Sequence, residues 1–174
     1  MKKALSATLL ALLAACSTTP DRVSRPAASS SSADAAFEAF ADPSANAGLA
    51  TYALNYLGVP YRFGGASPAS GFDCSGLVAY VSQAVLGLKL PRQSEQMIAA
   101  GAPVSQADLR PGDLVFYNTL HRKYSHVGIY LGDGRFVHSP SSGGVVRIES
   151  MDVAYWKKRF NGARRLASSE PSAR

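Results

Sequence analysis

One cysteine and two histidines are the side chains of this sequence best suited to breaking an amide bond. Cys74 stands between Phe72-Asp73 and Ser75-Gly76, where a glycine-containing loop enters a predicted helix. Unpaired backbone N–H groups and the helix dipole favour negative charge at such a place. We therefore expect the pKa of Cys74 to fall from about 8.5 into the range of roughly 3.5–7.5, giving a thiolate nucleophile. The same N–H groups could bind a developing oxyanion.

Two histidines flank a predicted hairpin turn at Gly132-Asp133-Gly134. His126 begins the strand before the turn, and His138 ends the strand after it. An imidazole has the intrinsic pKa to accept the thiol proton and later give it to a leaving amine. If both side chains face the same side, they are cross-strand neighbours about 5 Å apart at Cβ. We therefore predict His126 as the base and His138 as the group that holds its tautomer, and we expect His121 in a loop.

Hydrophobic periodicity predicts helices in the first half of the domain and strands in the second. The predicted helices cover residues 49–57, 77–85 and 91–100. The predicted strands cover residues 114–117, 126–131, 135–138 and 145–148, and a last element covers residues 155–166. Helices followed by an antiparallel sheet define the α+β class. We find neither an internal repeat nor a second domain.

The composition fits one globular domain and argues against several classes of partner. Of 174 residues, 47% are hydrophobic and 17% are charged, which suffices for one buried core. The formal net charge is +6, with Lys2 and Lys3 at the N-terminus. The remaining positive charge is concentrated near the C-terminus, where a solvated basic face and a partner site are both open interpretations. No nucleic-acid module accompanies these charges, so we expect no nucleic-acid binding. One cysteine and two histidines also lack the spacing of a metal site, so we expect neither metal nor cofactor.

The N-terminus has the pattern of a bacterial lipoprotein signal. Residues 1–15 combine a cationic start with an apolar run that is too short to span a membrane. The run ends in Leu13-Ala14-Ala15-Cys16, which resembles a lipobox and predicts a lipidated Cys16. An ordinary signal followed by a coincidental cysteine is the alternative. Ser17 in place of Asp points by analogy to the outer membrane of a Gram-negative bacterium, with the protein anchored on its periplasmic face.

The composition after the signal predicts a tether and then a compact domain. Residues 16–45 are rich in Ser, Ala, Thr and Pro, which cannot offset their ordering entropy by burial. We assign them to a flexible tether, residues 46–166 to the globular domain and residues 167–174 to a disordered tail. If Cys16 is lipidated, Cys74 is a single thiol in an oxidising compartment, where structural cysteines normally pair. Nucleophilic catalysis would explain it.

Six motifs between Ala47 and Leu166 carry a family resemblance. They are Tyr61-Arg62-Phe63-Gly64-Gly65, Phe72-Asp73-Cys74-Ser75-Gly76-Leu77-Val78, Leu90-Pro91-Arg92, Leu109-Arg110-Pro111-Gly112-Asp113-Leu114-Val115-Phe116, Ser125-His126-Val127-Gly128-Ile129-Tyr130-Leu131-Gly132 and Phe136-Val137-His138. Together they resemble the NlpC-type cell-wall peptidases, papain-like enzymes of bacteria. The resemblance implies a papain-like α+β fold in which N-terminal helices pack on a central antiparallel sheet.

The resemblance also implies roles for individual side chains. It implies Cys74 as nucleophile, His126 as base and His138 as the polar group that orients the base. It places the Tyr61 hydroxyl in the active site near the oxyanion, although Tyr61 is also a plausible packing residue. Three more residues are implied to shape the substrate cleft, namely Asp73, Ser75 and Arg92. For Asp73, a role as helix N-cap is an equally good interpretation.

The implied substrate is the peptide part of peptidoglycan. Members of this family hydrolyse stem-peptide bonds, often next to meso-diaminopimelate, and the lipobox makes the chain look most like outer-membrane lipoprotein members, some of which cut cross-links. We expect a monomer with a lipid-anchored contact to the membrane. A non-catalytic wall-binding scaffold and an acyltransferase or amidase remain as alternatives. The sequence does not specify the bond, because that choice depends on loops such as residues 66–71 and 118–124.

Overall fold

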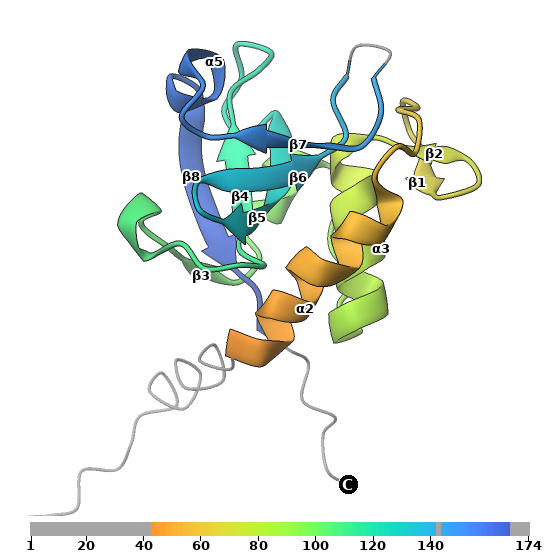
Figure 1. Ribbon diagram of the computed structural model, residues 1–174, viewed down its shortest axis with the longest axis horizontal. Helices are drawn as coiled ribbons and strands as arrows, with labels where there is room; N and C mark the ends of the chain where they lie inside the picture. Colours follow the sequence, from red (N-terminus) through yellow and green to blue (C-terminus); the bar gives the residue numbers. More distant parts are fainter. Residues whose placement is uncertain (1–42, 142–143, 168–174) are drawn as a thin grey trace, which may run out of the picture.

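Two helices pack side by side against one face of an antiparallel sheet (Figure 1). This computed structural model describes residues 43–141 and 144–167. The predicted signal peptide, Cys16, most of the predicted tether and most of the predicted tail therefore lie outside the described residues. The tether was predicted to reach residue 45, but a helix already begins at Pro43. None of the described helices is long and apolar enough to cross a membrane.

The sheet contains six strands in the order β3-β8-β4-β5-β6-β7. Every neighbouring pair is antiparallel. The strands are β3 (Ala102–Pro103), β4 (Leu114–Tyr117), β5 (His126–Gly132), β6 (Arg135–His138), β7 (Arg147–Ser150) and β8 (Phe160–Arg165). The α+β class predicted from the sequence is thus confirmed.

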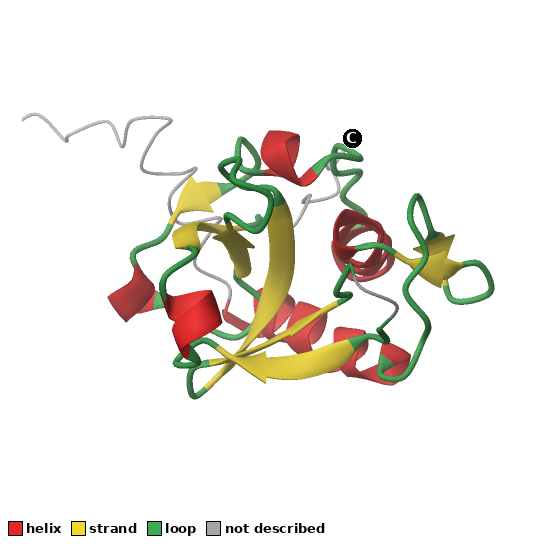
Figure 2. Ribbon diagram, turned by 90° about the horizontal axis from the view of Figure 1, so that it is seen from above, coloured by secondary structure: helices red, strands yellow, loops and turns green. Residues whose placement is uncertain are grey.

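The helical layer consists of two long helices and several short ones. Their bounds are α2 (Pro43–Ala53), the 3₁₀ turn η1 (Leu54–Tyr56), α3 (Cys74–Leu86), α4 (Ser94–Met97), the 3₁₀ turn η2 (Gln106–Asp108) and α5 (Ala154–Lys157). A small ribbon of β1 (Ala66–Ser67) and β2 (Gly71–Phe72) packs on α3. Viewed from above, α3 lies between this ribbon and the main sheet (Figure 2).

The core lies between α2, α3 and β5. Leu49 of α2, Leu77 and Val81 of α3 and Ile129 of β5 are all fully buried in one hydrophobic cluster. Leu77 and Val81 belong to the apolar stripe whose helical spacing predicted a helix there. The helix ends at Gly87, whose φ of 68° is the left-handed conformation favoured at a C-cap. Burial of this stripe fixes α3, and with it Cys74, against the strand that begins at His126.

Local sequence signals predicted some elements well and others poorly. The bounds of β4 and β6 match the prediction, whereas β7 begins two residues later than predicted. The helix predicted over residues 91–100 shortens to α4. The last predicted element divides into α5 and β8, and β8 inserts between β3 and β4. Such a long-range partner leaves no local signature in the sequence.

Candidate active site

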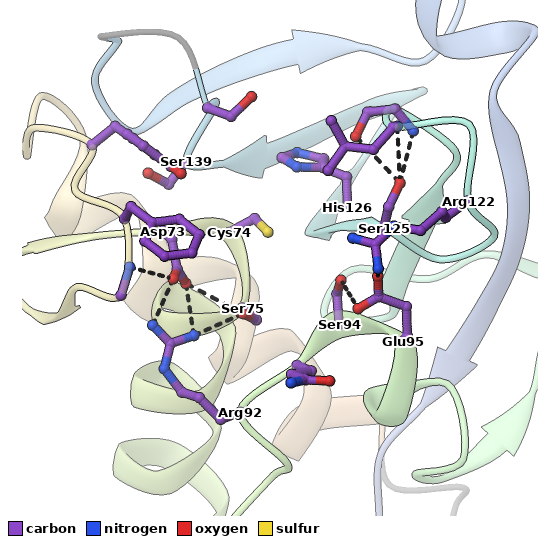
Figure 3. Close-up of a pocket in the computed structure, with 17 residues that line it drawn as sticks. Asp73, Cys74, Ser75, Arg92, Ser94, Glu95, Arg122, Ser125, His126 and Ser139 are labelled. Carbon is purple, nitrogen blue, oxygen red and sulfur yellow. Dashed lines mark hydrogen bonds and ion pairs between the residues drawn. The ribbon is translucent and has the colours of Figure 1, made fainter.

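Cys74 is the first residue of α3, at the floor of a cleft. The preceding residue, Asp73, caps the helix, since its Oδ1 accepts a hydrogen bond of 2.7 Å from the backbone N–H of Gly76. The interpretation of Asp73 as an N-cap is therefore confirmed. Cys74 is half-buried, and its sulfur faces the ring of His126 across the cleft (Figure 3).

A partly buried ion pair between Asp73 and Arg92 fixes the start of α3 (Figure 3). Arg92 donates from Nη1 to Oδ1 of Asp73 at 2.8 Å and from Nη2 to Oδ2 at 2.6 Å. Its Nη1 also donates to the hydroxyl of Ser75 at 2.8 Å, and that hydroxyl donates to Asp73 at 3.2 Å. Burial alone would raise the pKa of Asp73, but the hydrogen bonds from Arg92 and Gly76 outweigh it and hold the pKa below its ordinary value. These three predicted cleft residues thus form one network beneath Cys74.

The two histidines of the hairpin meet in the protein interior. Nε2 of His126 lies 2.7 Å from Nδ1 of His138, and both residues are buried. The contact leaves Nδ1 of His126 as the ring nitrogen that is free to face a reacting group. The His126 ring also stacks on Trp156 of α5, with centroids 5.5 Å apart and planes at 27°. Sequence reasoning missed Trp156, although it is the single tryptophan of the chain.

The register of the hairpin corrects one detail of the prediction. Ile129 pairs with Val137, so one step further along Gly128 lies opposite His138. His126 is therefore a diagonal neighbour of His138 rather than its direct partner, a spacing of about 7–8 Å that two rings can bridge. The prediction of direct cross-strand neighbours was wrong. The pair of Ile129 and Val137 is symmetric about Asp133, so the residue opposite His138 is Gly128 and not His126.

Gly128 supplies the space that β6 needs beside His138. A Cβ at this position would lie 2.7 Å from Cδ2 of Phe136, 2.9 Å from the carbonyl oxygen of Val137 and 3.3 Å from Cβ of His138. A side chain there must push β6 away from β5. The position of the His138 ring thus depends on a residue with no chemistry of its own.

We expect Gly128→Ala to lower stability by about 1–3 kcal/mol, because it overpacks the interior between β5 and β6. We expect catalysis to fall at least tenfold as well, since His138 moves with β6. Thermal melting and hydrolysis rates check the two effects. Gly48→Ala is the matched control, because its Cβ would meet only the side chain of Val85, at 3.1 Å. Full activity in Gly128→Ala would contradict the positional role of this glycine.

Burial sets the protonation of the facing pair, contrary to the sequence-based prediction of a thiolate. It raises the pKa of Cys74 to about 11, although the backbone N–H groups of Val127 and Ser75 favour the thiolate. Burial likewise lowers the pKa of His126 to about 4 and that of His138 to about 2. The predicted lowering by the helix N-terminus was wrong for the substrate-free site, because loss of water around the sulfur outweighs the dipole. Thiol and neutral imidazole are the resting forms.

Alkylation of Cys74 should reveal this neutral pair. We expect its rate with iodoacetamide to keep rising between pH 5 and pH 9, because the thiol pKa of about 11 lies above that window. The measurement uses a Cys16→Ser protein, in which Cys74 is the single thiol, and free cysteine as the reference. A rate that is constant from pH 5 to pH 8 would instead show a standing thiolate.

The cleft has a volume of about 420 Å³ and is lined by all the predicted catalytic and cleft residues except His138. Tyr61 lines it, and the pKa of its hydroxyl is raised by burial and by the nearby Asp73 and Cys74, so the hydroxyl stays protonated. His138 lies behind His126, fully buried. His121 lies in an exposed loop, as predicted. Within the described residues, no three His, Cys, Asp or Glu side chains are grouped so as to hold a metal ion.

Comparisons with known proteins identify relatives of this chain. The chain is 46% identical over 128 residues to the gamma-DL-glutamyl hydrolase of Bacillus subtilis strain 168, covering 72% of this chain and 31% of that protein. It is 41% identical over 116 residues to the murein DD-endopeptidase MepH of Escherichia coli K12, covering 65% and 43%. The chain therefore spans less than half the length of either relative.

A solved structure and a family model agree with these relatives. The crystal structure of an NlpC/P60 family protein from Bacillus cereus superposes with a TM-score of 0.64 at 33% identity, covering 70% of this chain and 40% of that one. The family model described as the NlpC/P60 family matches residues 58–165, which include the helix of Cys74 and the hairpin of His126 and His138. The chain belongs to the NlpC/P60 family.

Proposed function

We propose that this protein is a cysteine endopeptidase that hydrolyses peptide bonds of peptidoglycan. The observation that carries the proposal is the alignment of three side chains: Cys74 faces His126, and His126 contacts His138 at 2.7 Å. This is the order of nucleophile, base and orienting group that acyl transfer requires. Membership of the NlpC/P60 family supports the same reading.

The first half of the reaction transfers one proton and forms one bond. Sγ of Cys74 attacks the substrate carbonyl carbon while Nδ1 of His126 takes the thiol proton, so a neutral resting pair becomes charged only during attack. Nε2–H of His126 donates to Nδ1 of His138, whose low pKa keeps it an acceptor. The tetrahedral intermediate then collapses to a thioester, and the leaving amine takes the proton from His126.

The second half returns the enzyme to its starting state. Water attacks the thioester as His126 removes its proton, and the acyl part leaves as a carboxylic acid while Cys74 recovers its proton. We assign the negative oxygen of each intermediate to the backbone N–H groups at the start of α3 and to the protonated Tyr61 hydroxyl. The Asp73–Arg92 ion pair keeps that helix start in place, which is a positioning role.

The proposed substrate and location rest on different observations. The substrate proposal is supported by one relative named a murein DD-endopeptidase and another named a gamma-DL-glutamyl hydrolase. The lipobox-like sequence before Cys16 supports a lipid anchor, Ser17 supports the outer membrane as its location, and the composition of residues 16–45 supports a flexible tether that would hold the domain beside the cell wall. Mass spectrometry of the mature protein tests the anchor: a first residue other than a lipidated Cys16 would contradict it.

Digestion of purified murein tests the proposed activity. We expect the wild-type protein to release new amino groups and Cys74→Ala to release none. Equal release by both proteins would refute the catalytic role of Cys74. Binding to murein without release by the wild type would favour the non-catalytic scaffold. Transfer of the acyl group to an added amine, without hydrolysis, would favour an acyltransferase.

A further inference from the structure

A second cleft adjoins the first at His126. It also has a volume of about 420 Å³, and both clefts are lined by Thr119, His126 and Ser141. Cys74 lines the first cleft but not the second, whereas His126 lines both. The reaction therefore begins at Cys74 in the first cleft, and His126 lies between that cleft and the second. Because His126 must return its proton to the leaving amine, the leaving part of the substrate belongs on the far side of His126. The second cleft is therefore suited to the residue that follows the cleaved bond.

One ion pair equips this second cleft for a charged group. Nε of Arg147 donates to Oε1 of Glu149 at 2.8 Å, and both residues line the cleft. Within the part of the chain that the structure describes, Nη1 and Nη2 of Arg147 have no hydrogen-bond partner. Glu149 thus binds the Nε side of the guanidinium and leaves the terminal Nη1 and Nη2 groups available to a ligand. That end matches the two oxygens of a carboxylate.

The other arginines beside the catalytic pair are less suited to this task. Both Nη atoms of Arg92 are bound to Asp73. Arg122 lines the first cleft, where its side chain pairs with Glu95 at 3.1 Å. Among the described residues, Arg147 is the cation that lines the second cleft.

We propose that Arg147 binds a free α-carboxylate on the residue that supplies the leaving amine. This inference rests on the proposed peptidase function and adds a choice of bond to it. In a peptidoglycan cross-link to diaminopimelate, the carbon next to the scissile nitrogen bears a free carboxylate. At a bond within the stem, the carboxyl group on the carbon next to the scissile nitrogen can instead form the next peptide bond, and it then carries no charge. Arg147 therefore selects cross-links over such bonds.

The charge of Arg147 also connects the second cleft with the triad. After burial and the neighbouring His126, Arg147 is the third cause that lowers the pKa of His138. A carboxylate bound to Arg147 offsets this positive charge when His126 becomes an imidazolium. Binding the correct leaving residue would then also favour the charged form that the reaction passes through.

Two matched cross-linked peptides test the proposal. They differ only at the carboxyl group next to the scissile nitrogen, which is free in one and a primary carboxamide in the other. We expect Arg147→Gln to lower kcat/KM for the free carboxylate about 10- to 100-fold, mainly through KM, and to change the carboxamide less than twofold. Arg135→Gln is the control, because Arg135 is another exposed arginine with a carboxylate partner, Asp133. It should leave both substrates unaffected.

Binding of the leaving fragment gives a readout that is independent of turnover. Trp156 is the single tryptophan and lines the second cleft, so its emission reports occupancy. We expect a peptide with the free carboxylate to bind Cys74→Ala at least tenfold more tightly than its carboxamide, with the difference lost on adding Arg147→Gln. Equal loss of both substrates, or no loss, would overturn the proposal. Inactivity of the wild type toward whole murein would overturn the proposed function itself.

Discussion

Replacing His126 with alanine is expected to lower hydrolysis by about 10³-fold, because His126 is the imidazole that faces the Cys74 thiol (Figure 3). The neutral resting pair makes the loss large, since the thiol has a pKa of about 11 and needs a proton acceptor during attack. Rates on murein and a thermal melt of the same sample separate lost chemistry from lost folding. His121→Ala is the matched control, because His121 is exposed and, unlike His126, does not line the cleft of Cys74.

His138 should contribute less, because it acts through His126. We expect His138→Ala to lower the rate about 10- to 100-fold, and His138→Gln, which can still accept a hydrogen bond from Nε2 of His126, to recover part of the loss. A His126→Ala variant with more than a tenth of wild-type activity would contradict the assignment of the base. So would an equal loss in His121→Ala.

Replacing Arg165 with methionine is expected to destabilise the fold by about 3–5 kcal/mol, because it leaves a buried carboxylate unpaired. Arg165 of β8 donates from Nε and Nη2 to the two oxygens of Asp113, at 2.8 and 2.7 Å. The Asp113 side chain is fully buried, and its Oδ2 also accepts from the backbone N–H of Arg110. Urea unfolding of the variant measures the loss.

Two further variants identify the cause of this destabilisation. Arg159→Met is the control, because Arg159 lies half-buried over the Tyr155 ring and should change stability by less than about 1 kcal/mol. The double variant Asp113→Asn with Arg165→Met should recover part of the loss, since it removes the uncompensated charge. A single variant as stable as the wild type would show that this ion pair does not hold β8 in the sheet.

Local patterns in the sequence predicted the parts of the fold that local physics determines. The apolar stripe of α3 and the tight turn before β6 follow from side-chain periodicity and glycine chemistry alone. Cys74 begins α3, and His126 and His138 lie in the two strands that the turn joins. The expectation that these three residues come together in space agrees with the structure. Asp73 was given two interpretations, and the structure shows that it both caps α3 and lines the cleft.

Features that depend on tertiary packing could not be predicted in this way. The thiol pKa depends on how much water the assembled cleft removes from Cys74, which the helix position alone does not reveal. The stacking of Trp156 on His126 depends on β8 entering the middle of the sheet and carrying α5 with it. The second cleft, with Arg147, forms only after β7 pairs with β6 and α5 folds over them.

Mass spectrometry of muropeptides is the most direct test of Cys74 as a nucleophile for peptidoglycan bonds. Purified murein is digested with wild type or Cys74→Ala, and all soluble fragments are weighed. We predict that wild type replaces cross-linked dimers with pairs of monomers whose masses sum to that of the dimer plus one water. We also predict that Cys74→Ala leaves the dimers intact. An unchanged fragment pattern with wild type, or the same cleavage by Cys74→Ala, would contradict this account.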